Sequence, residues 1–257
     1  MPLTIIRQEG ERLDNYIEGR NPVLEALRAG RPINKIMLLK TVERHSTIAE
    51  IVHLAQIQGV PLEYVEKPAL DRLSQTPANQ GVLAQTAAKE YVDIDEMITS
   101  AKSGQDKPLL LVLDGIEDPQ NLGAILRSVD ASGVQGVIIR EKRAVGLTPS
   151  VEKASAGALE YVPVARVTNI SQTIEKLKQA DIWVVGIDQA GDTNYTRIDY
   201  KPATAIVIGG EGKGLSDLVK KNCDFLAFIP MRGKISSLNA SVAAAVVMYE
   251  VVRQREG

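Results

Sequence analysis

The segment that decides the fold class runs from Ile229-Pro230-Met231 through a short loop to Ser236-Ser237-Leu238-Asn239-Ala240-Ser241-Val242-Ala243. An apolar strand enters a polar loop, and the loop leads directly into a helix rich in alanine and valine. One side chain is enough to cap a helix, so several of the Ser and Asn side chains there are not needed as caps. The arrangement predicts a small polar pocket at a strand-to-helix corner, where ligands of α/β proteins usually bind.

A glycine-rich loop over residues 208–215 has the same order of apolar strand, loop and helix. Its glycines leave the backbone with little side-chain cover, so that a ligand can approach closely. A dinucleotide-binding loop is one alternative, but such a loop follows the first strand of its unit, whereas this one follows roughly the fifth. A purely structural turn is the other alternative. Glu211 between the glycines favours a cation or N–H and O–H groups over a phosphate.

Residues 114–128 form the third segment of this kind, with Asn121 and Arg127 on one predicted helix. Asn121 lies where a helix N-cap is expected. An ordinary surface ion pair is one interpretation of Arg127. Its position next to Ile125, Leu126 and Val129, close to the apolar stripe of the helix, instead favours a phosphate or carboxylate partner.

Two domains and a linker are predicted from the order of the elements. Residues 1–88 alternate between helices and strands and form a small α/β domain. Residues 89–107 are polar and contain a short helix over 93–101; we interpret them as the linker. In the second domain, residues 108–257, nearly continuous apolar strands separated by helices predict a parallel sheet covered on both faces. Its strands are expected at 109–113, 136–139, 162–164, 183–187, 204–208 and 225–229, and its last helix at 239–253.

Composition excludes several classes of function. The chain has a single cysteine, Cys223, so an internal disulfide is excluded and a reducing compartment is favoured. We interpret Cys223 as a buried thiol. With only His45 and His53 besides, no zinc site is expected. No apolar run is long enough to cross a bilayer, and the N-terminus lacks a signal-peptide core, so we expect a cytoplasmic protein. The net charge of −2 does not itself indicate nucleic acid.

Local basic clusters are therefore needed if the partner is RNA. One such cluster lies in the first half of the small domain, and it contains Arg7, Arg12, Arg20, Arg28, Arg31, Lys35 and Lys40. An RNA-binding face explains how a mildly acidic protein holds RNA. A mixed, solvated surface is the alternative, because acidic residues are interleaved.

The three segments, in this order, resemble the signature motifs of the SpoU-type RNA ribose methyltransferases of the SPOUT superfamily. Residues 17–27 resemble the start of that family's RNA-binding domain, in the branch that modifies a guanosine of large-subunit (23S-type) rRNA. The resemblance implies an enzyme that transfers the methyl group of S-adenosyl-L-methionine to a ribose 2′-hydroxyl without a metal. It also implies a homodimer and a C-terminal trefoil knot, which the general rule against knots would not predict.

The resemblance also assigns residues. The functional polar positions correspond to Asn121, Arg127, Glu211, Ser237 and Asn239. The cofactor positions correspond to Gly209, Gly210, Glu211, Gly214, Ile229, Met231, Ser237, Leu238 and Asn239. The RNA contacts would come from Arg20, Arg28, Arg31, Lys35 and Arg127. Arg127 has two open roles, proton removal and a phosphate clamp. Two alternatives remain open for the whole protein: a tRNA ribose methyltransferase, and a ribosome-assembly factor that binds RNA without catalysis.

Overall fold

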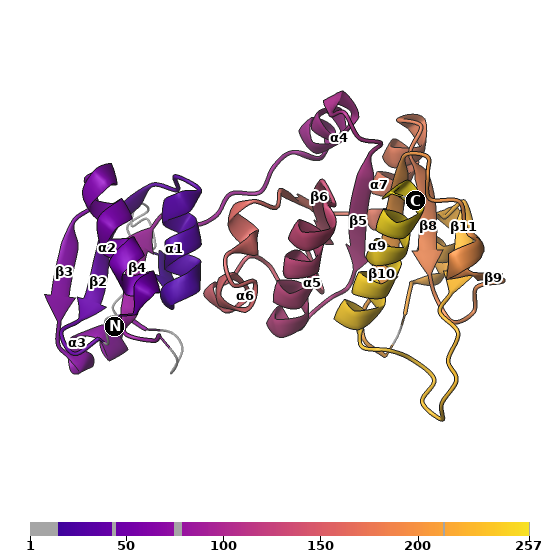
Figure 1. The fold of residues 1–257 in the computed structure, drawn as a ribbon. Coiled ribbons are helices and arrows are strands. Elements are labelled where there is room, and N and C mark those ends of the chain that lie inside the picture. The colour runs from indigo at the N-terminus through magenta and orange to yellow at the C-terminus, as the bar shows by residue number, and fades with distance from the viewer. Residues whose placement is uncertain (1–14, 43–44, 75–78, 213, 257) are drawn as a thin grey trace, which may run out of the picture. The chain divides into compact units, whose positions relative to one another are not determined.

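The structure is a computed structural model that describes residues 15–42, 45–74, 79–212 and 214–256. The chain divides into two compact units, Met1–Lys89 and Glu90–Gly257, which Figure 1 shows in indigo and in magenta to yellow. Arg7 and Arg12 of the predicted basic cluster lie outside the described residues. Among the described residues, no helix is long and apolar enough to cross a membrane.

The first unit is a four-stranded sheet with helices on both faces. Its strands are β1 (Asn15–Glu18), β2 (Ile33–Leu39), β3 (Leu62–Val65) and β4 (Val82–Thr86), in the order β1-β4-β2-β3. Only β2 and β3 are parallel neighbours. The helices are α1 (Arg20–Arg28), α2 (Ser46–Gln58) and α3 (Lys67–Leu73). Residues of α1 and α2 share one core with the sheet, and Leu70 of α3 packs with Met37 and Leu83 in another.

The second unit is built on a seven-stranded sheet in which all neighbouring strands are parallel. In sheet order the strands are β7 (Val164–Val167), β6 (Gly136–Arg140), β5 (Leu109–Asp114), β10 (Thr204–Gly209), β8 (Trp183–Ile187), β11 (Phe225–Phe228) and β9 (Thr193–Asn194). The helices are α4 (Ile94–Ser103), α5 (Pro119–Ser132), α6 (Pro149–Ala154), α7 (Ile170–Gln179), α8 (Asp217–Asn222) and α9 (Ala240–Glu256). Two 3₁₀ turns, η1 (Ala158–Glu160) and η2 (Tyr195–Arg197), complete it.

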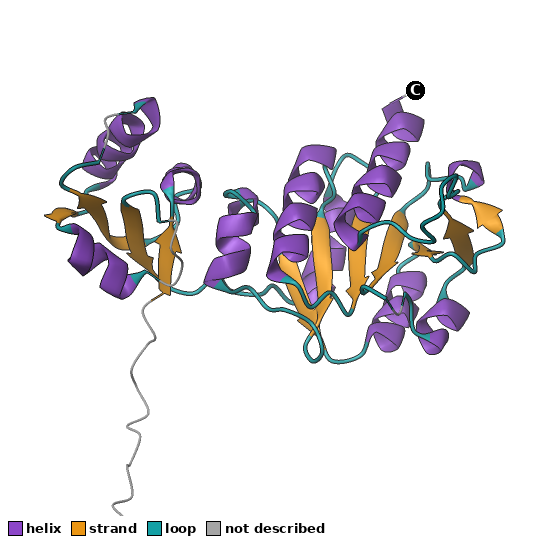
Figure 2. Cartoon of the chain, turned by 90° about the horizontal axis from the view of Figure 1, so that it is seen from below, coloured by secondary structure: helices purple, strands orange, loops and turns teal. Residues whose placement is uncertain are grey.

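Helices cover both faces of this sheet, as the apolar strands predicted (Figure 2). Successive side chains of a strand point to opposite faces, so β5 contributes to two cores. Leu111 packs with residues of α5, α6 and α9, whereas Val112 packs with residues of α4, α7 and α8. The mixed α/β class and the parallel sheet are thereby confirmed.

The stretch predicted as a linker, residues 89–107, belongs largely to the second unit. The N-cap of helix α4 is Asp93, whose side chain accepts hydrogen bonds from the N–H groups of Asp95 and Glu96. Its apolar face is buried in the second core. A Cβ at Gly136 would lie only 2.6 Å from Met97 Sδ, so that core is closely packed there. The polar composition of residues 89–107 suggested a linker because only one face of α4 is buried and its other residues are polar.

The strands β7 and β9 also differ from the prediction. β7 begins at Val164, two residues later than expected, because Pro163 has no N–H to donate to a neighbouring strand. The edge strand β9 consists of Thr193 and Asn194 and carries no apolar signal.

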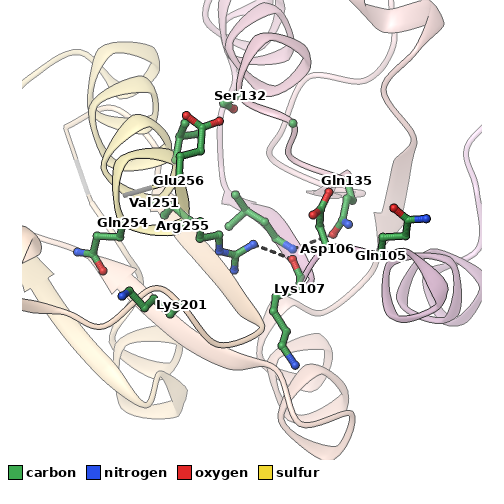
Figure 3. A pocket seen from close by; sticks show the side chains of 13 residues that line it. Gln105, Asp106, Lys107, Ser132, Gln135, Lys201, Val251, Gln254, Arg255 and Glu256 are labelled. Carbon is green, nitrogen blue, oxygen red and sulfur yellow. Dashed lines mark hydrogen bonds between the residues drawn. The ribbon is translucent and has the colours of Figure 1, made fainter.

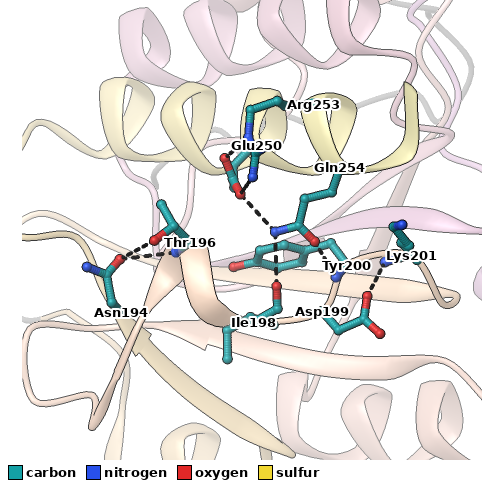
Figure 4. Close-up of polar contacts among 9 residues, drawn as sticks. All are labelled: Asn194, Thr196, Ile198, Asp199, Tyr200, Lys201, Glu250, Arg253 and Gln254. Carbon is teal, nitrogen blue, oxygen red and sulfur yellow. Dashed lines mark hydrogen bonds and ion pairs between the residues drawn. The ribbon is translucent and has the colours of Figure 1, made fainter. Parts of the chain in front are cut away.

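Hydrogen bonds anchor the end of α9 to the segment that precedes β10 (Figure 4). Gln254 donates to the carbonyl of Ile198 at 3.0 Å and accepts from the N–H of Tyr200 at 3.0 Å. Glu250 in turn accepts from Gln254 at 2.8 Å and from Arg253 at 2.7 and 2.8 Å. The charge on Glu250 therefore orients the amide that joins the two segments.

Candidate functional site

Two neighbouring cavities lie at the carboxyl ends of the central strands. The first, here called the β10 cavity, has a volume of about 350 Å³. The second, the β5 cavity, has a volume of about 440 Å³. Gly210, Glu211 and Gly214 line both of them, so a single loop separates the two. Both volumes fall in the range of small-molecule sites, about 300–1,000 Å³.

The β10 cavity gathers most of the residues that the resemblance assigned to the cofactor. They are Gly209, Gly210, Glu211, Gly214, Ile229, Ser237 and Leu238. The remaining two, Met231 and Asn239, are not among its lining residues. The strand ends supply an apolar part with Ile187, Ile208 and Ile229, and the loop before α9 supplies Ser236 and Ser237.

The glycine loop is shaped first by contacts within the chain. A Cβ at Gly209 would lie 2.2 Å from the carbonyl carbon of Gly214, and one at Gly210 would lie 2.2 Å from the carbonyl oxygen of Gly115. A Cβ at Gly214 would meet Asp188 at 2.7 Å. Only at Gly212 is the space open. The prediction that these glycines expose backbone to a ligand is therefore incomplete, because three of them are required for backbone packing.

A chain of hydrogen bonds joins the glycine loop to α5 and α9. Asn239 Nδ2 donates to Asn121 Oδ1 at 2.9 Å, and Asn121 Nδ2 donates to the carboxylate of Glu211. Asn239 Oδ1 accepts from the backbone N–H of Ser241 at 2.9 Å and from that of Val242 at 3.4 Å. Asn239 therefore caps α9, and three residues that are far apart in the sequence meet at one point.

Asn121 itself is not a helix cap, contrary to the prediction. The cap of α5 is Asp118, whose side chain accepts from the N–H of Gln120 at 2.9 Å. Asn121 is the third residue of the helix and is buried. Its amide is thus free to serve Glu211 and Asn239, which makes it a linking residue rather than a cap.

Two aspartates that sequence reasoning missed hold the loops in place. Asp114, buried at the end of β5, accepts from the N–H and the hydroxyl of Ser216 at 3.1 and 3.0 Å. Asp188, which follows β8, accepts from the N–H of Leu215 at 3.2 Å and lies 3.0 Å from Lys220 Nζ. Both positions carried a usable signal, because each carboxylate ends or directly follows an apolar strand.

The electrostatics of Asp188 reflect competing effects. Burial alone raises its pKa, but hydrogen bonds from the N–H groups of Ala190 and Leu215, together with Lys220, outweigh burial and lower the pKa below its ordinary value. The group is therefore held as a carboxylate. It lines the β10 cavity beside the glycine loop.

Arg127 is exposed on α5 and makes no hydrogen bond or ion pair with any described residue. The carboxylate partner that the sequence allowed is thus not found within the described part of the chain. Because it has no partner among the described residues, Arg127 is available for a ligand phosphate, which guanidinium groups bind in a bidentate manner.

A third cavity, of about 580 Å³, lies away from these residues, between the end of α9 and the start of β5 (Figure 3). Arg255 is its central cation. Its guanidinium donates to the carbonyls of Lys107, Pro108 and Pro202, and its Nε to that of Tyr200. Because these carbonyls use its donors, Arg255 anchors the C-terminal helix and is not free for a ligand.

Cys223, predicted to be a buried thiol, is only half-buried in the structure. Burial, with a smaller contribution from Asp224, raises the pKa of Cys223 to about 12, so its thiol is not a nucleophile at neutral pH. Among the described residues, no group of three or more His, Cys, Asp or Glu side chains could hold a metal ion.

The other four residues predicted to bind RNA, Arg20, Arg28, Arg31 and Lys35, have partners within the first unit. Arg28 pairs with Glu50 at 2.6 Å and with Glu25 at 2.7 Å, and Lys35 pairs with Glu63 at 3.1 Å. The guanidinium of Arg20 donates to the carbonyl of Gln80, and that of Arg31 to the carbonyl of Ala87. These contacts are solvent-exposed and individually weak, so phosphates can compete with them.

Comparison with known families gives two matches. Residues 108–249 match the model of the SpoU rRNA methylase family, and residues 16–92 match the model for RNA 2′-O ribose methyltransferase substrate binding. A Bacillus subtilis protein assigned to the TrmH family of tRNA/rRNA methyltransferases is 45% identical over 241 residues, which cover 94% of this chain and 96% of that protein.

Solved structures show the same similarity. The SpoU methyltransferase AviRb from Streptomyces viridochromogenes, in complex with the cofactor AdoMet, is 26% identical with a TM-score of 0.80 and coverage of 95% of this chain and 91% of that one. The AdoMet-bound rRNA methyltransferase from Sinorhizobium meliloti is 25% identical, with a TM-score of 0.77. The match covers 93% of this chain and 87% of that one.

Proposed function

The chain belongs to the SpoU rRNA methylase family, and on this premise we propose that it transfers a methyl group from S-adenosyl-L-methionine to the ribose 2′-hydroxyl of a guanosine in large-subunit ribosomal RNA. As a member of the family the protein is an RNA methyltransferase, and S-adenosylmethionine is its cofactor. The ribose position, the guanosine and the ribosomal target are our proposal. They rest on the family resemblance and on the substrate-binding match over residues 16–92.

The β10 cavity is the proposed cofactor site, and its residues fit the group. Ile187, Ile208 and Ile229 offer an apolar surface for an adenine ring, while Asp188 and Glu211 offer acceptors for ribose hydroxyls and complement a sulfonium cation. Gly209 and Leu238 would make contact mainly through their backbone, and Ser237 through its hydroxyl. When bound, the cofactor supplies a methyl group on a sulfonium with a good leaving group, so that positioning dominates the catalytic requirement.

The single observation that carries the proposal is the link from Glu211 through Asn121 to Asn239. It brings the three family motifs together at the wall of the β10 cavity, and its two connecting hydrogen bonds span 90 and 118 positions of sequence. Asn239 and Asn121 hold the loops rather than touch the cofactor. We assign Arg127 to the substrate, where a permanently charged guanidinium binds a phosphate or stabilises a developing alkoxide.

Two further parts of the proposal concern the whole protein. We propose a homodimer that uses α9, because Val242 and Tyr249 on this helix are 48% and 50% exposed. A C-terminal knot stays a prediction of the family resemblance.

Two measurements test the function. Isothermal titration with S-adenosylmethionine in excess chelator should show one site per chain, and tight NAD binding without cofactor binding would refute the cofactor site. Mass-spectrometric mapping of ribose methylation in RNA from cells that lack the protein identifies the target. We expect one missing 2′-O-methylguanosine in large-subunit rRNA. A missing mark in tRNA would establish the tRNA alternative, and no missing mark would favour the non-catalytic one.

A further inference from the structure

The β5 cavity lies at the same edge of the sheet as the β10 cavity, but the proposed cofactor does not occupy it. It is formed by the end of β5 and the loop after it, by Arg140 at the end of β6 and Arg143 after it, and by the glycine loop. It also lies between β5 and β10, where the chain changes direction: β6 and β7 follow β5 on one side, and β10 lies on the other. Ligands of open parallel sheets bind at such a switch point.

Most of the carboxylates around the β5 cavity are already engaged. Asp114 accepts from Ser216 and lies 3.5 Å from a guanidinium nitrogen of Arg140. Asp118 caps α5, and Glu211 accepts from Asn121. Each of these three carboxylates therefore already has a partner within the protein.

Two charged residues of the lining remain available, Arg143 and Glu117. Both are exposed, and neither makes a hydrogen bond or ion pair with any described residue. Among the described residues that line it, the cavity thus presents one free cation and one free anion. Its matching ligand carries an anionic group and, at a distance from it, a group with N–H donors.

Arg143 is held in position although it lies on a loop. Its φ of 58° is in the left-handed region, which is uncommon for a residue other than glycine and costs on the order of 1 kcal/mol or more. The loop is fixed beyond it, because the N–H of Val145 donates to the carbonyl of Ile116 at 2.8 Å and the N–H of Leu147 donates to Tyr91 Oη at 2.9 Å. On the facing loop, Gly115 has a φ of 92°, and a Cβ there would lie 3.7 Å from the carbonyl oxygen of Arg143, an ordinary contact distance.

We propose that the β5 cavity is the pocket for the acceptor nucleotide, in which Arg143 binds a phosphate of the RNA and Glu117 accepts from the base. This proposal rests on the proposed methyltransferase function and extends it to the substrate. A guanidinium is the side chain best suited to a phosphate. Among the four bases, guanine alone presents two adjacent N–H donors on its Watson–Crick edge, and single-stranded RNA is read on such edges. The free carboxylate therefore selects guanosine.

The position of the pocket agrees with the reaction. The β5 and β10 cavities share the wall made by Gly210, Glu211 and Gly214, so the two ligands lie on either side of one short loop. A nucleotide in the β5 cavity would place its ribose beside this wall, near the linked Glu211 and Asn121.

Arg143→Ala and Lys142→Ala form a matched pair for the first test. Both remove one exposed cation from the same loop, but only Arg143 lines the β5 cavity. The assay is methyl transfer to large-subunit rRNA from cells lacking the protein. We expect kcat/KM for RNA to fall at least tenfold in R143A and less than threefold in K142A, with an unchanged Kd for S-adenosylmethionine in both. Equal losses of kcat/KM in the two variants would overturn the assignment of the β5 cavity as the nucleotide pocket.

Glu117→Gln and Glu141→Gln test the base contact in the same way, because both glutamates are exposed and only Glu117 lines the cavity. E117Q should lower kcat/KM at least fivefold, and E141Q should not. Wild-type transfer that yields a methylated nucleoside other than guanosine would overturn the assignment of Glu117. Failure of the wild-type chain to bind S-adenosylmethionine or to methylate any RNA would instead refute the proposed function itself, which keeps the two failures distinct.

Discussion

Hydrogen bonds around Asn121 run in one direction because the carboxylate of Glu211 can only accept. Asn121 must turn its NH₂ group toward Glu211, so its oxygen faces Asn239. Asn239 must then turn its NH₂ group toward Asn121, which leaves its oxygen for the N–H groups at the start of α9. A charge in the glycine loop thus fixes the entry of the last helix. Truncating any member would leave a polar partner unpaired, at a cost of about 1–3 kcal/mol.

Arg127 carries the first residue-scale prediction. Arg127→Ala should lower turnover on RNA by about two to three orders of magnitude, the typical loss when transition-state electrostatics are removed. The Kd for S-adenosylmethionine, measured by titration, should stay near the wild-type value, because Arg127 does not line the β10 cavity. Asn239→Ala is the comparison variant and should impair both quantities. Wild-type turnover by Arg127→Ala would show that the site is wrongly assigned.

Asp188 gives a prediction about pH. Its pKa is lowered in the folded protein, so its ionisation stabilises the fold above the unfolded-state pKa of about 3.9, and this contribution disappears as pH falls through the lower folded-state pKa. Asp188→Asn should therefore reduce the free energy of unfolding in urea at pH 7, by about 1–3 kcal/mol, and the deficit should shrink below about pH 4. Asp192→Asn, at an exposed position, should show no such deficit. A deficit that grows on acidification would contradict the argument.

At the scale of elements, the glycine loop shows how a motif can serve the fold and the site together. Gly209, Gly210 and Gly214 allow the loop to fold against itself, against the β5 loop and against Asp188. This compact loop then forms the shared wall of the two cavities. Ligand access is therefore a consequence of backbone packing and does not require each glycine to face the ligand.

Gly209→Ala tests this interpretation. The added Cβ would lie 2.2 Å from the backbone of Gly214, so the loop must shift, and overpacking of this kind costs about 1–3 kcal/mol. We expect a lower unfolding free energy and a weaker affinity for S-adenosylmethionine. The matched control is Gly233→Ala, where nothing lies within 4 Å of the new Cβ; it should stay within about 0.5 kcal/mol of wild type. If Gly209→Ala is equally silent, the packing role is excluded.

The sequence predicted the main strands of the second unit because their apolar runs are buried on both faces, as β5 is over its whole length. It could not predict β9, whose Thr193 and Asn194 have no apolar signal, and it placed α4 in a linker because that helix buries only Met97, Ile98 and Ala101. The hydrogen-bond partners of Asn121, Glu211 and Asn239, lie 90 and 118 positions away in the sequence. Local patterns do not carry such pairings, so only the family resemblance identified these residues together.

At the scale of the whole molecule, the division at Lys89 and Glu90 separates the part matched to substrate binding, residues 16–92, from the part that carries both cavities. The net charge of −2 gives no general attraction for RNA. The basic residues of the first unit form exposed contacts within the unit, as Arg28 does with Glu25 and Glu50. RNA binding by this unit thus requires phosphates to replace weak internal partners.

A truncated chain that begins at Glu90 tests this division of labour. It retains Val92, whose N–H bonds the carbonyl of Val164, and the buried face of α4, so we expect it to fold and to bind S-adenosylmethionine as the full chain does. A chain that begins at Lys107 lacks α4, uncovers part of the second core, and should be less stable. Comparing both by titration and urea unfolding separates loss of the RNA module from damage to the fold.

The decisive quantity is the slope of log affinity for rRNA against log salt concentration. Each phosphate that the protein neutralises releases counterions, so a chain with fewer contacts has a shallower slope and a weaker affinity. We expect the chain starting at Glu90 to lose at least tenfold in affinity at moderate salt and to keep only the part of the slope that its own cations, such as Arg127 and Arg143, supply. Equal affinities and equal slopes for the two chains would mean that the first unit does not hold RNA. Its sheet and helices would then serve to dock another protein, and target choice would rest with the cavities of the second unit.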